Sequence, residues 1–138
     1  MDIDARLQTV AEELSAGMPG RVVTRSFRDP SEFDDADLLR GVVMIVATGA
    51  GDFSEVLQRA LGEADITFAV VGYVLTDECN REAQGLAVER AELALFAEIQ
   101  AAVRDSTVCA LDISALNQSR QLESPHGWIV VNMTWREV

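Results

Sequence analysis

A largely apolar run, followed directly by a long helical pattern, dominates the middle of the chain. The run covers residues 66–76 and reads ITFAVVGYVLT. Its alternating residues are Ile66, Phe68, Val70 and Val74 on one face and Ala69, Val71, Tyr73 and Leu75 on the other. Because both faces are apolar, this strand is predicted to lie in the middle of its sheet. Gly72 interrupts the run, and a glycine inside a strand predicts a bulge or a close backbone approach.

The helix that follows is predicted to begin between Thr76 and Asn80 and to end at Arg104, a length of about 40 Å. It carries two apolar stripes, which is more apolar surface than one core requires. The first stripe, predicted to cover the sheet, contains Val88, Ala91, Leu95, Ile99 and Ala102. The second contains Leu86, Leu93 and Ala97 beside Glu89, Arg90 and Gln100. This second stripe is expected to be either partly solvated or in contact with another subunit.

The amino-acid composition limits the classes of protein to which this chain can belong. The chain has 138 residues and an apolar fraction of 49%, enough for a single domain whose core needs no disulfide or metal. Its net charge of −12, with eleven arginines and no lysine, argues against binding along nucleic acid. No apolar run is long enough for a membrane span and the N-terminal residues are polar, so a cytoplasmic protein is expected. Cys79 and Cys109 are predicted to be buried free thiols.

The N-terminal part of the chain is predicted to contain a helix, an edge strand and an acidic loop. The helix covers residues 2–16, with Gly17 just past its end. Residues 21–28, RVVTRSFR, favour a strand, but arginines on both faces predict an edge position or a surface that meets another molecule. Residues 29–37 collect five acids around Phe33 without the spacing of a calcium loop, so a solvated loop is expected rather than a metal site.

A second apolar strand is predicted over residues 41–48, followed by the turn Gly49-Ala50-Gly51 and a short helix over residues 52–61. An extended hairpin over residues 52–64 is the alternative to that helix. A strand, a glycine turn and a helix in succession also match the start of a nucleotide-binding α/β enzyme domain. However, Ser54 occupies the position where that motif requires a third glycine or alanine, and no further strand–helix units follow.

Two further strands are predicted to close the sheet as an antiparallel hairpin, over residues 107–113 and 128–136, with a polar connection over residues 114–127. In the last strand, Trp135 lies on the core face, whereas Trp128, Asn132 and Thr134 lie on the other face. The resulting order is α-β-β-(short α)-β-α-β-β. The fold class is therefore α+β, a single domain with one mainly antiparallel sheet and helices packed on one face.

The sequence contains no recognisable catalytic constellation. His126 is the only histidine, and no serine or cysteine is placed by sequence as its nucleophile, so it is interpreted as a turn residue. HExxH, CxxC, Walker and GxSxG motifs do not occur. These observations favour a binding or assembly protein over an enzyme, with no metal and no cofactor.

The order of elements resembles the tail terminator family, also called tail completion proteins, of long-tailed bacteriophages of the lambda-like and Mu-like kinds. The likeness covers nearly the whole chain and is one of pattern rather than of a short motif. It is carried by the N-terminal helix, the segments RVVTRSFRDP and GVVMIVATG, the strand ITFAVVGYVLT entering the long helix, and the closing strand GWIVVNMTWREV. Neck and head–tail completion proteins of related build are similar too.

The resemblance implies a structural protein of the virion, assembled in the host cytoplasm and located at the head-proximal end of the tail. It implies a homohexameric ring that docks on the last ring of tail-tube subunits, stops tube growth and presents its other face to head–tail connector proteins. No membrane and no specific nucleic-acid sequence is involved. The candidate residues for a subunit or tube interface are Arg25, Arg28, Leu86, Glu89, Arg90, Leu93, Asn132 and Thr134.

Overall fold

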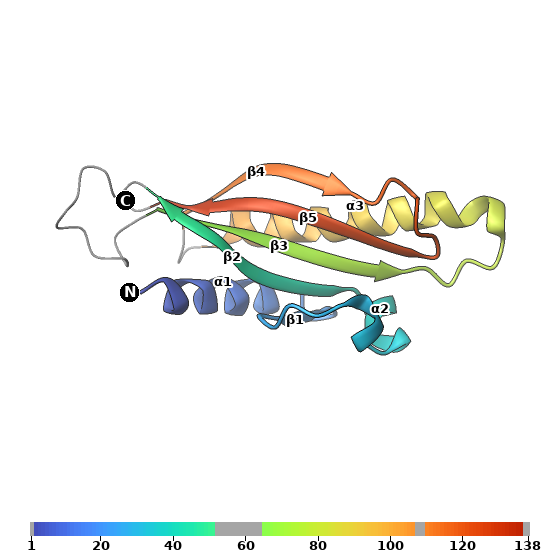
Figure 1. Ribbon diagram of the computed structural model, residues 1–138, viewed down its shortest axis with the longest axis horizontal. Helices are drawn as coiled ribbons and strands as arrows, with labels where there is room; N and C mark the ends of the chain where they lie inside the picture. Colours follow the sequence, from blue (N-terminus) through green and yellow to red (C-terminus); the bar gives the residue numbers. More distant parts are fainter. Residues whose placement is uncertain (1, 52–64, 107–109, 137–138) are drawn as a thin grey trace.

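The strand with two apolar faces, β3 (Asp65–Leu75), is central, as predicted. In the computed structural model, which describes residues 2–51, 65–106 and 110–136, β3 pairs antiparallel with β2 (Val42–Gly51) and with β5 (His126–Trp135). At one edge β4 (Leu111–Gln118) pairs antiparallel with β5, and at the other β1 (Val22–Thr24) pairs parallel with β2. The five-stranded order is β1-β2-β3-β5-β4 (Figure 1). The predicted α+β domain with a mainly antiparallel sheet is confirmed.

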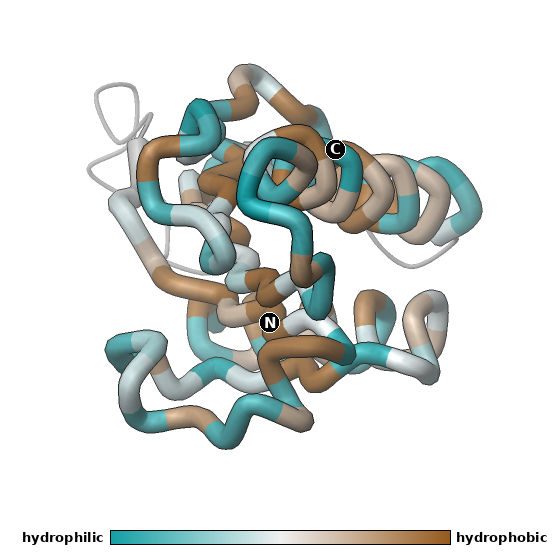
Figure 2. Tube along the Cα trace, turned by 90° about the vertical axis from the view of Figure 1, so that its right-hand side faces the viewer, coloured by the Kyte–Doolittle hydropathy of each residue, from teal (hydrophilic) through white to brown (hydrophobic). Residues whose placement is uncertain are grey.

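Two helices cover one face of this sheet, α1 (Ile3–Gly17) and α3 (Arg81–Asp105). Each begins at a side-chain cap, because Asp2 accepts a hydrogen bond from the Ala5 N–H and Asn80 from the Glu82 N–H. The core between the helices and the sheet includes Leu7, Val10, Leu14, Ile66, Phe68, Val70, Val88, Leu95, Ile99, Ile129, Val131 and Met133. In Figure 2 hydrophobic segments gather toward the middle of the molecule, whereas the helical turns alternate between hydrophobic and hydrophilic residues. The first apolar stripe of the long helix therefore faces the sheet, as predicted.

Among the described residues, the opposite face of the sheet is covered at one end only, by a segment that was predicted to be a loop. This segment forms a short 3-10 helix, η1 (Pro30–Glu32), and then α2 (Asp35–Arg40), so the loop prediction was wrong in part. A physical reason is that acidic residues stabilise a helix start: Asp29 and Glu32 form a capping box around η1, and Asp35 and Asp37 lie in the first turn of α2. The segment is anchored by a second apolar cluster that contains Phe33, Leu38, Val42, Met44, Ala69, Val71 and Tyr73.

Gly72 in β3 permits the long helix to lie close to the sheet. A Cβ atom added at this position would stand 2.5 Å from Leu95 Cδ2 and 2.9 Å from Ile129 Cγ1. Both distances are shorter than a van der Waals contact between carbon atoms. The close approach at Gly72 is therefore made by side chains of α3 and β5 rather than by a backbone, and the regular register of β3 at this position shows no bulge.

Several predicted boundaries differ from those observed. Only three residues of the predicted strand over 21–28 pair with a neighbour, although the edge position is confirmed. The helix predicted over residues 52–61, and its hairpin alternative, lie outside the described residues. The connection predicted over residues 114–127 is shorter, because β4 continues to Gln118. The sequence of β4 does not show the two-residue alternation of a strand, because a register shift between Ile113 and Ala115 adds one residue and breaks that period.

Two charged side chains are buried on the helix-covered face, and the sequence analysis identified neither. Arg6 of α1 is 1% exposed, its Cζ lies 4.9 Å from the centroid of the Trp135 ring, and its Nη2 donates to the Trp135 carbonyl oxygen at 3.2 Å. Glu92 of α3 is also 1% exposed. Its carboxylate accepts hydrogen bonds from the Ser119 hydroxyl and from the Trp128 backbone N–H, the latter at 2.9 Å. These contacts connect α1 to the end of β5 and α3 to the turn between β4 and β5.

Candidate interaction surfaces

Two of the predicted interface residues, Arg25 and Arg28, already have contacts within the chain. Arg25 Nη1 lies 2.7 Å from a carboxylate oxygen of Asp4 in α1. The guanidinium carbon of Arg28 lies 4.5 Å from the centroid of the Phe33 ring, a cation–π geometry. These intramolecular contacts make both arginines weaker interface candidates than their place beside an edge strand suggests.

Asn132 and Thr134 lie on the face of the sheet opposite α1 and α3, where β5 pairs with Ala69 and Thr67 of β3. Both residues are half-buried. Thr67, on the same face, is exposed. Small and polar residues thus occupy the end of this face that the η1–α2 cluster does not cover.

The second stripe of α3 is exposed. Leu86 and Leu93 have relative exposures of 43% and 45%, and Arg90 and Ala97 are exposed beside them. Glu89 differs from the others, since one of its carboxylate oxygens lies 3.5 Å from Gln121 Nε2, in the turn between β4 and β5. Within the described part of the chain nothing covers the two leucines, so contact with another subunit stays a prediction.

The turn between β4 and β5 adds residues to this surface that the sequence analysis did not identify. Arg120 and Gln121 have positive φ angles of 58° and 65°, which turn the chain sharply toward α3. The Gln121 side chain packs on Gly85, where a Cβ atom would stand 2.3 Å from its Oε1 atom. Leu122 then projects outward with a relative exposure of 73%. A leucine in a polar connection is the only sequence signal for this position.

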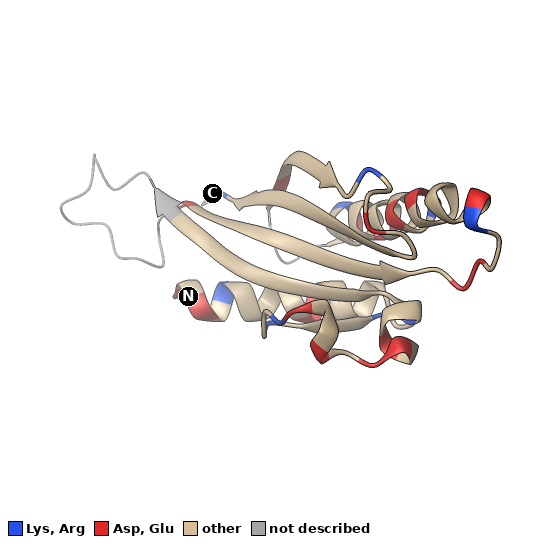
Figure 3. Ribbon diagram, turned by 45° about the vertical axis from the view of Figure 1, so that its right-hand side comes forward, with Lys and Arg blue, Asp and Glu red and all other residues tan. Residues whose placement is uncertain are grey.

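Eight of the described arginines fall into two groups. Five are paired with a nearby acid: Arg21 with Glu98, Arg25 with Asp4, Arg40 with Asp37, Arg104 with Asp105 and Arg136 with Asp112. Among the residues that the structure describes, Arg81, Arg90 and Arg120 are exposed and have no acidic partner. All three lie in the N-terminal half of α3 or in the turn that packs on it. Figure 3 shows positive charge at both places.

The η1–α2 segment carries the opposite charge. Asp34 and Asp35 are exposed, and within the described residues neither forms an ion pair. Leu39, four residues after Asp35 and therefore beside it on the helix surface, has a relative exposure of 48%. Negative charge is visible along this segment in Figure 3. Acidic and apolar groups thus lie together at the β1–β2 side of the sheet, where Arg40 Nε donates to the Gly20 carbonyl oxygen.

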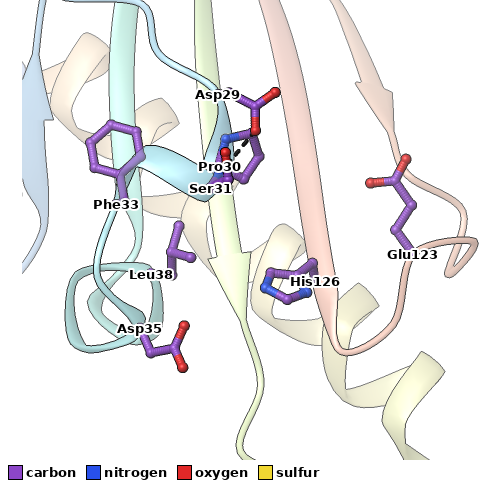
Figure 4. Close-up of a pocket in the computed structure, with 8 residues that line it drawn as sticks. All are labelled: Asp29, Pro30, Ser31, Phe33, Asp35, Leu38, Glu123 and His126. Carbon is purple, nitrogen blue, oxygen red and sulfur yellow. Dashed lines mark hydrogen bonds between the residues drawn. The ribbon is translucent and has the colours of Figure 1, made fainter.

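A groove of about 400 Å³ runs between this segment and the start of β5 (Figure 4). It is lined by Asp29, Pro30, Ser31, Phe33, Asp35, Leu38, Glu123 and His126. His126 is the first residue of β5 rather than a turn residue, and in Figure 4 its ring lies across β3 from Asp35 and Leu38. In residues 2–51, 65–106 and 110–136, no group of three or more His, Cys, Asp and Glu residues is arranged to hold a metal ion.

Hydrogen bonding and burial shift two pKa values beside this groove. The backbone N–H and the side chain of Ser31 hydrogen-bond to Asp29, which lowers the pKa of its carboxyl group, because they favour the charged form. Burial raises the pKa of the Tyr73 hydroxyl, and the negative charge of Asp29 raises it further. Tyr73 also packs edge-on against Phe33, with ring centroids 6.2 Å apart. The negative charge of Asp29 thus raises the pKa of Tyr73, a residue of the second apolar cluster.

Two other predictions on single residues are corrected. Gly49-Ala50-Gly51 does not form a turn, because these residues belong to β2 and pair with residues Asp65 to Thr67 of β3. A phosphate-binding loop requires the glycines to leave the strand, so this geometry does not match the dinucleotide-binding alternative. Cys79 is exposed rather than buried, in the segment between β3 and α3. Cys109 lies outside the described residues.

Comparison with protein-family models and with curated proteins found no match to this chain. None of the helices in the described residues is long and apolar enough to cross a membrane.

Proposed function

We propose that this protein is the tail terminator of a long-tailed phage or prophage, a subunit of a ring that caps the tail tube and stops its growth. The resemblance in the order of elements motivates the proposal. The observation that carries it is the exposed second stripe of α3, where Leu86 and Leu93 flank the unpaired Arg90. Exposed apolar residues on a rigid helix, accompanied by an unpaired arginine, are typical of a surface that another protein covers.

In this proposal the protein acts by binding and carries out no reaction. Ring formation brings the same face of every subunit to one end, which creates a flat surface that a free subunit lacks. The polar, half-buried Asn132 and Thr134 on the open end of the sheet are suited to contact with the tail-tube protein or the lumen. The other end of the ring is then available to the head–tail connector proteins. The working location is the head-proximal end of the tail in the virion.

Native mass spectrometry tests the ring, and tube length tests the function. The purified protein is expected to have about six times the subunit mass, and a phage lacking it is expected to make overlong tubes without heads. Adding the protein to polymerising tail-tube protein should give shorter tubes. A protein that stays monomeric and leaves tube length unchanged contradicts the proposal. Tubes of normal length that fail to join heads indicate a neck protein instead.

A further inference from the structure

The exposed leucines and unpaired arginines of α3 and of the β4–β5 turn form one surface, here called the basic patch. It consists of Arg81, Leu86, Arg90, Leu93, Arg120 and Leu122. Leu86, Arg90 and Leu93 share one side of the helix at spacings of four and three residues. Gln121 holds the turn against the same helix. Its side chain contacts Gly85, and its Nε2 atom lies 3.5 Å from Glu89 Oε1. Residues far apart in the sequence thus belong to one surface.

The composition of the basic patch indicates an acidic partner with apolar groups. The chain has 23 acids for eleven arginines, so an arginine that forms no ion pair is an exception to the average charge of this protein. Arg81 and Arg90 are next to Glu82 and Glu89 in the sequence, but within the described residues neither pairs with its neighbour. Three such arginines lie on the same elements as three of the five large apolar side chains that are exposed among the described residues. Apolar groups with charges around them match the core and rim of a protein interface. An acidic, partly apolar surface would satisfy both kinds of group.

The chain carries such a surface on the other face of its sheet, here called the acidic patch. It consists of Asp34, Asp35 and Leu39 at the start and on the exposed side of α2. The two patches lie on opposite faces of the sheet, since α3 packs on the face that bears the main core, whereas α2 packs through Leu38 on the second apolar cluster of the other face. One subunit therefore has two complementary surfaces that face different neighbours.

We propose that the basic patch of one copy docks on the acidic patch of the next copy. This contact is heterologous, because different surfaces of the two copies meet, and repetition of such a contact closes into a ring when the rotation allows it. The proposal rests on the ring-forming function above and assigns the surfaces that build the ring. Opposite charges steer the copies together, and Leu86, Leu93, Leu122 and Leu39 provide the apolar contact.

Charge reversal in the full-length protein tests this assignment. Arg90→Glu with Arg120→Glu reverses the basic patch, and Asp34→Arg with Asp35→Arg reverses the acidic patch. Each pair of changes is expected to weaken assembly at least about tenfold by sedimentation equilibrium, because like charges then meet. Combining all four changes in one chain restores opposite charges and is expected to recover the ring. Arg104→Glu and Asp105→Arg, at the exposed end of α3 away from the patch, are matched controls that should assemble normally.

The outcomes separate this inference from the proposed function. Circular dichroism and thermal melting establish that each variant is folded before its mass is interpreted. Rings of normal mass from both reversed variants overturn the inference, and normal tube length in the same samples leaves the terminator function standing. Reversed variants that form normal rings but no longer control tube length overturn the inference too, because the patches would then face the tube rather than another copy. A wild-type protein that stops at a dimer overturns the head-to-tail contact, and a wild-type monomer overturns the ring itself.

Discussion

The carboxylate of Glu92 accepts a hydrogen bond from the Ser119 hydroxyl in the interior of the domain, across 27 positions of sequence. The same carboxylate oxygen accepts the Trp128 backbone N–H at 2.9 Å, and Gln118 Nε2 lies 3.4 Å from the other oxygen. Both Glu92 and Ser119 are almost fully buried. This network fixes the turn that carries Arg120 and Leu122 on α3, so the shape of the basic patch depends on it.

Ser119→Ala is expected to destabilise the fold by about 1–3 kcal/mol, because it leaves a buried carboxylate with one hydrogen bond fewer. Urea unfolding followed by tryptophan fluorescence measures this cost. Ser114→Ala is the matched control. Ser114 is exposed and its hydroxyl donates to the Asn132 carbonyl oxygen, so its loss should cost within about 0.5 kcal/mol. Equal costs for the two variants would contradict the role assigned to the buried network.

Gly72→Ala is expected to destabilise the domain by about 1–3 kcal/mol, because the added methyl group meets Leu95 and Ile129 at the contact between α3 and the sheet. Gly20→Ala provides the comparison, since a Cβ atom there has no other atom within 4 Å. That change should be neutral or slightly stabilising. Thermal unfolding of both variants measures the difference. A Gly72→Ala protein as stable as wild type would mean that the helix is not packed this closely.

Trp135→Ala is expected to cost more stability than Trp128→Ala. Trp135 packs against the main core and against Arg6, whereas Trp128 packs at the side of the smaller cluster. Both tryptophans are half-buried, so the Trp135 value should fall at the lower end of the usual range of about 3–5 kcal/mol. The midpoint of urea unfolding compares the two. The opposite ranking would contradict this prediction, because it would mean that packing on the face that bears η1 and α2 contributes more to stability than packing in the main core.

Tyr73 is the only tyrosine, so its titration can be followed alone by absorbance. Burial and the charge of Asp29 raise its pKa, and the midpoint is expected above the ordinary value of about 10. Asp29→Asn removes that charge and should lower the midpoint. Because the folded state favours the neutral phenol, this stabilisation is present below about pH 10 and is lost as the pH rises through the folded pKa. A folded protein that titrates at or below about 10 would contradict this environment.

The sequence predicted the centre of this fold well and its edges less well, for a physical reason. β3 and α3 have long apolar patterns with clear periods, which local composition reveals directly. The register shift in β4 breaks its period, so that strand was predicted to end at residue 113 rather than at Gln118. The acids of α2 were interpreted as a loop, although the same acids stabilise the start of a helix.

The candidate surface was predicted only in part, because partners in space cannot be identified from one sequence. Leu86, Arg90 and Leu93 follow from helical spacing, and their exposure agrees with the second stripe. The sequence alone made Arg25 and Arg28 equally good interface candidates, but in the structure Arg25 pairs with Asp4 of α1 and Arg28 stacks on Phe33. Nothing in the sequence places Arg120 and Leu122 near α3, since a packed turn brings them there.

The stacking of Arg6 on Trp135 joins the first helix of the chain to the end of the last strand. Figure 1 shows the start of α1 and the end of β5 at the same end of the molecule. The domain is therefore expected to tolerate circular permutation, with the original ends linked by a few residues and a new opening in the exposed segment around Cys79. In such a permuted chain the hairpin of β4 and β5 would precede α1. The strands would then be synthesised in a different order, although the same five-stranded sheet is expected to form.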